Sequence, residues 1–206
     1  MRQFHLQDFE SFDTRFRVQF FQSLAGPKSV HLIGTKDEKG ISNLGVFSSV
    51  NHLGSNPPYF SFVNRPETVK RDTLSNIRST GFFTINSVPS KLLNQAHQTS
   101  GKYPAEISEF ESVGLTESYT DLINAPYVLE SPVKFGLELY KIIPLEMNGT
   151  LLVIGAVKEV IADPNFILDH GAFEHSELNS ISVAGPDTYY HSNSHKRMPY
   201  IGDVDK

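Results

Sequence analysis

Apolar and polar residues alternate along several short stretches of the chain, and a period of two is typical of half-buried β-strands. Two of these stretches are long and are separated by Asn148-Gly149, a dipeptide that favours a tight hairpin turn. Strands that succeed one another through hairpins pair antiparallel. The expected strands are residues 30–36, 41–50, 59–63, 82–88, 133–145 and 150–161.

Helical periodicity is confined to short segments. Near the N-terminus an apolar residue recurs at a spacing of three or four, which predicts one amphipathic helix ended by Gly26-Pro27. We expect its aromatic stripe to pack into the core. The stripe comprises Phe9, Phe12, Phe16, Phe20 and Leu24. Further helical segments are expected at 73–79, closed by Gly81, from Ser87 or Ser90 through His97, and as one turn at 107–112.

Strands outnumber helices, and the helices are insertions between hairpins. This order predicts a mainly β (α+β) fold, an antiparallel barrel with peripheral short helices rather than a parallel sheet covered by helices. No internal repeat, low-complexity block or linker divides the chain, so we expect a single domain over residues 1–206.

The amino-acid composition excludes several classes of binding partner and of chemistry. The chain has 206 residues, is 39% hydrophobic and 20% charged, and carries a net charge of −5 without a basic stripe, so nucleic acid is not an expected partner. No stretch is apolar enough to span a membrane, and the N-terminus lacks the apolar region of a signal peptide. Cysteine is absent, which excludes disulfides, thiolate catalysis and cysteine-ligated metals. We expect a cytoplasmic protein with no membrane partner.

Several catalytic motifs are missing. The chain has no Gly-rich dinucleotide fingerprint, P-loop, GxSxG elbow or HExxH motif. Adjacent Ser48 and Ser49 have no base at a fixed spacing, so we expect them to contact a ligand rather than to act as nucleophiles. We expect no metal site, and we interpret the paired histidines of the C-terminal part as solvated loop residues. These are His170 and His175, with Glu174 beside them, and His191 and His195.

The candidate ligand-binding residues are concentrated between residues 34 and 77. Ser48-Ser49 follows a strand, and small side chains there let a flat ligand approach the backbone. Arg65, Lys70 and Arg71 then form a cationic cluster just before a short helix whose cap is Asp72 or Thr73. Cations beside a helix N-terminus suit a phosphate. The segment therefore predicts a site for a planar heterocycle with an anionic tail.

The cationic cluster has a simpler interpretation as well. Arg65 and Arg71 could form surface ion pairs with Glu67 and Asp72. The pattern of the surrounding residues weighs against it.

That pattern resembles the flavin reductase-like family, whose members carry an FMN-binding split β-barrel and include flavoredoxins. The resemblance lies in the order and spacing of several motifs and covers roughly residues 28 to 162. The motifs are NLGVFSSV, NPPYFSF, NRPETVKRDTLSNI and TGFFTIN, followed more loosely by TSGKYP, ISEFESVGL and ELYKIIPL. The C-terminal part departs from the family, because VAGPDTY stands at 183–189 where many relatives have an Arg-Gly-Gly-x-x-Tyr segment.

The resemblance implies FMN as cofactor, with a redox centre that needs no catalytic side chain from the protein. It implies that the isoalloxazine is lined by Asn43, Phe47, Ser48, Ser49 and Val50. It implies that the ribityl phosphate is held by Asn64, Arg65, Arg71, Asp72 and Thr73. Arginine suits this role because its guanidinium binds two phosphate oxygens at once.

The resemblance also implies a homodimer with flavin near the interface. Two features of the chain agree with it. The strands 133–145 and 150–161 have apolar residues on both faces, and the polar connection 99–127 has too little apolar periodicity to pack on its own barrel. We therefore expect the connection to cover the partner's site.

Three functions remain open at this point. The first is an FMN-binding oxidoreductase that takes a hydride from NAD(P)H and passes electrons to a second acceptor. The second is a non-enzymatic protein that holds FMN for electron transfer, and the third is a barrel that has lost its cofactor. No nicotinamide-binding site can be recognised in the sequence. The sequence therefore does not distinguish the oxidoreductase from the electron-transfer protein.

Overall fold

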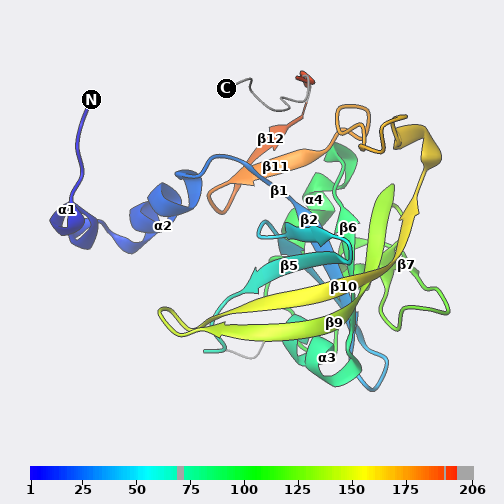
Figure 1. The fold of residues 1–206 in the computed structure, drawn as a ribbon. Helices are drawn as coiled ribbons and strands as arrows, with labels where there is room; N and C mark the ends of the chain where they lie inside the picture. Colours follow the sequence, from blue (N-terminus) through cyan, green and yellow to red (C-terminus); the bar gives the residue numbers. More distant parts are fainter. Residues whose placement is uncertain (69–71, 193, 199–206) are drawn as a thin grey trace.

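The computed structural model describes residues 1–68, 72–192 and 194–198 (Figure 1). Within these residues no helix is long and apolar enough to cross a membrane. The α-helices are α1 (Leu6–Ser11), α2 (Thr14–Ser23), α3 (Asp72–Thr80), α4 (Leu93–Gln98) and α5 (Glu109–Val113), with short 3-10 helices η1 (Ser90–Leu92) and η2 (Pro164–Phe166). The strands are β1 (Lys28–Ser29), β2 (His31–Lys36), β3 (Ser42–Phe47), β4 (Asn51–Ser55), β5 (Pro58–Asn64), β6 (Phe82–Ser87), β7 (Glu117–Ser118), β8 (Tyr127–Val128), β9 (Val133–Leu145), β10 (Thr150–Ala162), β11 (Ile181–Ala184) and β12 (Thr188–His191).

One antiparallel sheet dominates the molecule, with the order β3-β2-β6-β9-β10-β5-β4. Its two edge strands, β3 and β4, are joined in sequence by residues 48–50 alone. The sheet must therefore curl until its edges meet, yet the two edges do not pair. The result is an antiparallel split β-barrel with short peripheral helices, which confirms the predicted fold class.

The longest strand pair matches its expected bounds to within one residue, since β10 ends at Ala162 instead of residue 161. β9 and β10 form one hairpin around Asn148-Gly149, where Gly149 adopts a positive φ of 71° and Asn148 Oδ1 accepts a hydrogen bond from Thr150 N. Leu137 and Val153 on its inner face are fully buried. Gly155 is required for this packing, because a Cβ there would lie 2.5 Å from the ring of Phe83.

The connection 99–127 packs on its own barrel, so the expectation that it lacks such packing is wrong. Phe110, Ile123 and Tyr127 are buried, and the Tyr127 hydroxyl donates a hydrogen bond of 2.7 Å to Glu159 on β10. The apolar residues of this segment are spaced irregularly because they belong to turns and short elements. Periodicity therefore did not reveal them.

The expected strands do not include β4, β11 or β12. β4, with the sequence NHLGS, is mostly exposed and is held as an edge strand by backbone pairing to β5, so it lacks the apolar alternation of a buried strand. β12 is likewise largely exposed and pairs with β11, which continues to β1 in a separate three-stranded sheet. The expected strand 41–50 also ends earlier, at Phe47, because residues 48–50 cross the split.

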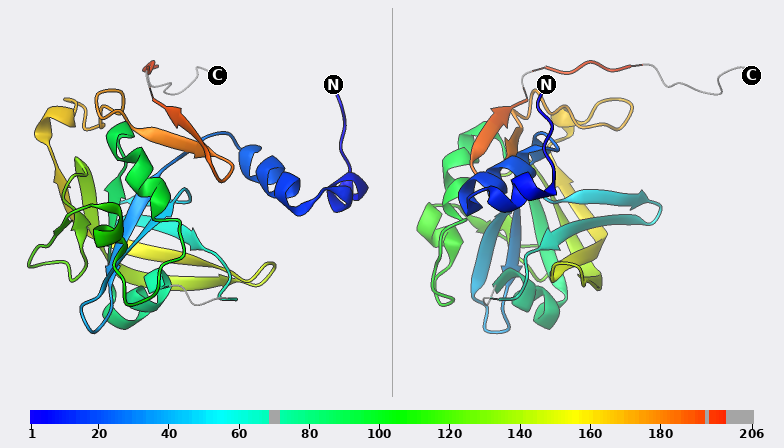
Figure 2. Two further views of the ribbon diagram at one scale, coloured as in Figure 1. Left: turned by 180° about the vertical axis from the view of Figure 1, so that it is seen from behind. Right: turned by 90° about the vertical axis from the view of Figure 1, so that its left-hand side faces the viewer.

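The N-terminal arm, defined as residues 1–24, differs most from its prediction. It forms two helices instead of one, because the side chain of Asp13 accepts hydrogen bonds from the backbone of Arg15 and Phe16 and so begins a second helix. Neither helix has a buried residue, and Phe16 is 50% exposed. The arm extends away from the barrel (Figure 2). Its aromatic stripe is therefore not part of the core.

One polar atom in the barrel stands out. His31 begins β2, and its Nδ1 is buried without a hydrogen-bond partner in the described part of the chain. Burial lowers the pKa of His31 from 6.5 to about 4, and the nearby His175 contributes to the same shift. Protonation of His31 is thus disfavoured in the folded protein.

This shift predicts acid sensitivity. The unfolded chain binds the proton below pH 6.5, whereas the folded chain does so only near pH 4. The contribution of His31 to the free energy of unfolding should be fully present above pH 6.5. It should fall by about 1–3 kcal/mol as the pH drops toward 4. Urea unfolding of His31→Gln between pH 7 and pH 4 should show a flatter profile than wild type, while the exposed control His52→Gln should follow wild type. Parallel wild-type and His31→Gln profiles would contradict the assignment.

Candidate functional site

A cavity of about 760 Å³ lies at the split of the barrel. Its first wall comes from one part of the sequence, namely β3 and the link that follows it, the end of β5, and the start of α3. This wall consists of Asn43, Leu44, Gly45, Val46, Phe47, Ser48, Ser49, Val63, Asn64, Arg65, Asp72 and Thr73.

Eight of the predicted site residues line this one cavity. They are Asn43, Phe47, Ser48, Ser49, Asn64, Arg65, Asp72 and Thr73. Val50 is not among the lining residues and packs against the core of the barrel. Arg71, like Lys70, lies outside the described residues. The ligand that each residue contacts stays a prediction.

A buried polar network joins β3 to the first turn of α3. Asn43 Nδ2 donates to Thr73 Oγ1 at 2.9 Å and to Thr35 Oγ1 at 3.2 Å. Asn43 and Thr73 are both more than nine-tenths buried. The network therefore fixes the start of α3 beside the cavity.

The two adjacent serines are not equivalent. The Ser49 hydroxyl donates to Val63 O at 3.2 Å and accepts from Val63 N at 3.1 Å, so it continues the pairing of β5 ahead of the first residue of β4. The Ser48 hydroxyl makes no hydrogen bond to any residue that the structure describes. Ser48 is thus the serine whose hydroxyl can serve a ligand.

The second wall of the cavity was not predicted. It comprises Gln22, Lys28, Thr99, Ser100, Gly101, Lys102, Tyr103, Glu109, Val183 and Gly185. These residues come from four distant parts of the chain, and their spacing carries no signal. The polar, Gly-bearing segment 99–103 belongs to the connection that we expected to cover the partner's site, and it lines the cavity of its own chain.

Glu109 reaches the cavity from α5. Its Oε2 accepts a hydrogen bond from Leu44 N on the edge strand β3 at 2.9 Å. Burial raises the pKa of Glu109 above its usual range, although the hydrogen bond from Leu44 opposes this shift. Its carboxylate therefore satisfies a backbone N–H group on the open edge of the sheet.

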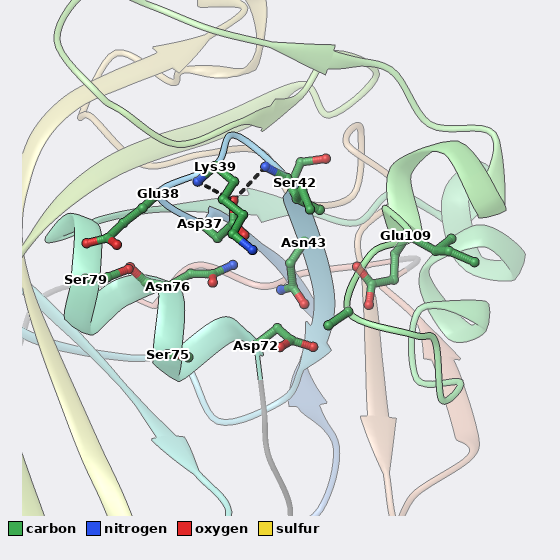
Figure 3. Close-up of a pocket in the computed structure, with 13 residues that line it drawn as sticks. Asp37, Glu38, Lys39, Ser42, Asn43, Asp72, Ser75, Asn76, Ser79 and Glu109 are labelled. Carbon is green, nitrogen blue, oxygen red and sulfur yellow. Dashed lines mark hydrogen bonds between the residues drawn. The ribbon is translucent and has the colours of Figure 1, made fainter.

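A smaller cavity of about 290 Å³ adjoins the first and shares Asn43, Asp72 and Glu109 with it (Figure 3). It lies between α3 and the β2–β3 turn. Among the residues that the structure describes, four carboxylates line it, from Asp37, Glu38, Asp72 and Glu109, against the ammonium of Lys39. This charge balance is unsuited to a phosphate, whereas Arg65, Lys28 and Lys102 line the larger cavity.

The paired histidines are exposed and belong to loops or to β12. His195 Nδ1 lies 3.3 Å from Glu174 Oε1, and His175 Nδ1 lies 3.0 Å from Ser180 Oγ. Among the residues described, no group of three His, Asp or Glu side chains is placed to hold a metal ion.

The volume of the larger cavity falls in the range of roughly 300–1,000 Å³ that is usual for small-molecule sites. Phe47, Gly45 and Val46 provide a small apolar surface, while Ser48, Asn64 and Arg65 provide polar groups around it. The arrangement can hold and orient a ligand with a flat apolar part and a charged part.

Comparison with known proteins agrees with this geometry. The flavin reductase like domain family matches residues 25–181. An uncharacterized protein of Aquifex aeolicus is 31% identical over 164 residues, covering 77% of this chain and 82% of the relative. The chain therefore belongs to the flavin reductase-like family.

Solved structures share the fold. A protein of Shewanella frigidimarina assigned as a flavin reductase with a split barrel domain has a TM-score of 0.93 and 39% identity, with 98% of this chain and 100% of that chain covered. Flavoredoxin of Desulfovibrio vulgaris (Miyazaki F) has a TM-score of 0.74 and 26% identity, with coverages of 86% and 93%. The protein is accordingly a flavin-related oxidoreductase by family.

The different bonding of the two serines gives a stability test. Ser49→Ala should leave the N–H and C=O of Val63 without their partner and lower the free energy of unfolding by about 1–3 kcal/mol. The matched variant Ser48→Ala should change it by less than about 0.5 kcal/mol. Urea denaturation measures both, and equal effects of the two substitutions would show that the Ser49 bonds do not stabilise the split.

Proposed function

We propose that the protein is an FMN-binding oxidoreductase of the flavin reductase type. It takes a hydride from NAD(P)H and passes the electrons to a second acceptor. The observation that carries the proposal is the cavity at the barrel split, where eight residues expected to contact FMN lie together. When bound, FMN supplies the redox chemistry, so the chain needs no nucleophile or metal of its own.

The residues of the first wall fit the two parts of FMN. Gly45, Phe47 and Ser48 would lie along the isoalloxazine, with the Ser48 hydroxyl donating to one of its polar atoms. Arg65 and the start of α3 would hold the phosphate, because a guanidinium binds phosphate oxygens and the N-terminal end of a helix favours negative charge. The acidic smaller cavity supports this orientation, since it would repel a phosphate.

The remaining chain residues exclude water and orient the second substrate. The segment 99–103, together with Lys28, forms the wall opposite the proposed flavin. We place the nicotinamide or the electron acceptor against this wall, where Lys28 and Lys102 offer positive charge. The working unit is proposed to be a cytoplasmic homodimer.

A second candidate is a non-enzymatic FMN protein that exchanges electrons with a protein partner. The likeness to a flavoredoxin favours it, with 26% identity over most of both chains. The two candidates differ in one property, namely turnover with reduced nicotinamide.

The placement of the phosphate predicts the effect of one substitution. Arg65→Ala should weaken FMN binding roughly tenfold to a hundredfold, because a hydrogen bond to a charged group contributes about 1.5–3 kcal/mol. Arg78→Ala is the matched control, since Arg78 pairs with Glu67 outside the cavity. Flavin-fluorescence titration of apo-protein measures both. Equal affinities of the Arg65→Ala, Arg71→Ala and wild-type proteins would refute the placement.

The enzymatic proposal predicts NADH or NADPH oxidation that depends on flavin. Steady-state absorbance assays with and without added FMN should show turnover, and Lys102→Ala should raise the KM for the nicotinamide severalfold at unchanged FMN affinity. Tight FMN binding with no oxidation of either nicotinamide would favour the electron-transfer candidate. A colourless protein with no affinity for FMN would indicate a barrel that has lost its cofactor.

A further inference from the structure

The N-terminal arm has an aromatic surface that its own barrel does not cover. Its phenylalanine rings contact one another, with centroid separations from 4.7 Å for Phe12–Phe16 to 6.4 Å for Phe9–Phe20. The rings in this cluster are Phe4, Phe9, Phe12, Phe16, Phe20 and Phe21. No residue of α1 or α2 is buried. Helices of 6 and 10 residues are too short to be stable in water without a surface to pack on.

The arm is weakly tied to the rest of its own chain. Within the described residues, one side-chain hydrogen bond joins its helices to the remainder, from Gln19 Nε2 to Asp187 Oδ1 at 2.9 Å. The arm and the tip of the β9–β10 hairpin project from the same side of the barrel with open space between them (Figures 1 and 2). The arm therefore does not fold back onto the strands beside it.

The barrel has an apolar face of its own to cover. Leu151 and Val153 point into the core, so Leu152 between them points outward. Leu152 pairs with Val63 on β5 and with Ile143 on β9, and all three side chains are only half-buried. This outer row is flanked by Tyr140, which is 63% exposed. One chain thus has two uncovered apolar surfaces that do not meet within it.

We propose that each arm docks on the outer β5–β10–β9 face of a second copy of this chain. A two-fold arrangement covers both surfaces at once, because the arm of each copy meets the face of the other. An aromatic side chain buries roughly 150–250 Å², so half of that for six rings on each of two arms is on the order of 1,000 Å². That area is enough for a substantial part of a stable dimer interface.

The charge of the arm favours a second copy over a membrane. The charges of the arm balance, with Arg2, Arg15 and Arg17 against Asp8, Glu10 and Asp13. An arm without excess positive charge is not drawn to an anionic lipid surface.

The proposed docking of the arm on a second copy, here called the arm exchange, also involves the larger cavity. Val63 belongs to both the outer row and the cavity wall, and Gln22 of α2 lines the same cavity. A docked second copy would therefore border the site that the proposed function assigns to flavin. The inference rests on the proposed homodimer and not on the proposed redox chemistry.

Photo-cross-linking tests the exchange directly. With p-benzoylphenylalanine in place of Phe16, irradiation should give an adduct of two chains, linked to a β5, β9 or β10 peptide of an isotope-labelled second copy. The same probe in place of Phe166, which belongs to η2 and to neither the arm nor the β5–β10–β9 face, is the control and should give no such adduct. Phe16→Asp should weaken dimerisation at least tenfold in light scattering, and Phe16→Leu should retain it.

Each other outcome overturns the proposal in a recognisable way. A dimer mass with an adduct inside one chain leaves the homodimer in place and removes the arm exchange. If light scattering gives the mass of one chain, both the homodimer and the arm exchange are refuted. If the protein cross-links only in the presence of phosphatidylglycerol vesicles, or sediments together with them, the arm binds a membrane instead of a second copy. FMN titration of the same samples measures flavin affinity, and so tests the proposed function independently of the arm exchange.

Discussion

The link of three residues between β3 and β4 is the constraint on which the rest of the structure depends. Such a short link cannot span the two edges of an open sheet, so the sheet must close into a barrel. The edges still do not pair, which leaves backbone groups of β3 and β5 without strand partners. Side chains satisfy some of them, with Ser49 on Val63 and Glu109 on Leu44. The split stays open as a cavity because its edges are satisfied without being joined.

The two cavities differ in charge, and this difference arises from the elements beside them. The β2–β3 turn brings Asp37 and Glu38 next to α3, while the end of β5 brings Arg65 to the opposite side of Asp72 and Thr73. An anionic group is therefore favoured on one side of the α3 N-terminus and disfavoured on the other. The buried Asn43–Thr73 bond keeps that boundary in place.

Local patterns predicted what local interactions determine. Asn148-Gly149 and the alternation around it marked β9 and β10, and Gly81 marked the end of α3. β4 escaped prediction because backbone pairing alone holds it, and the arm was misplaced because periodicity shows which face is apolar but not what covers it. The first wall of the site comes from one part of the sequence, and eight of its twelve residues were predicted. The second wall is assembled by the fold from distant segments and was not.

The separate origin of the two walls has an evolutionary consequence. The first wall is built from barrel strands and the start of α3, so most substitutions there disturb the sheet that closes the molecule. The segment 99–103 follows α4 and contributes no strand to the barrel. Its residues can change in length and character while the barrel stays intact. A lineage with this fold can therefore acquire a new reaction partner by varying one loop, and inherit the remainder of the pocket unchanged.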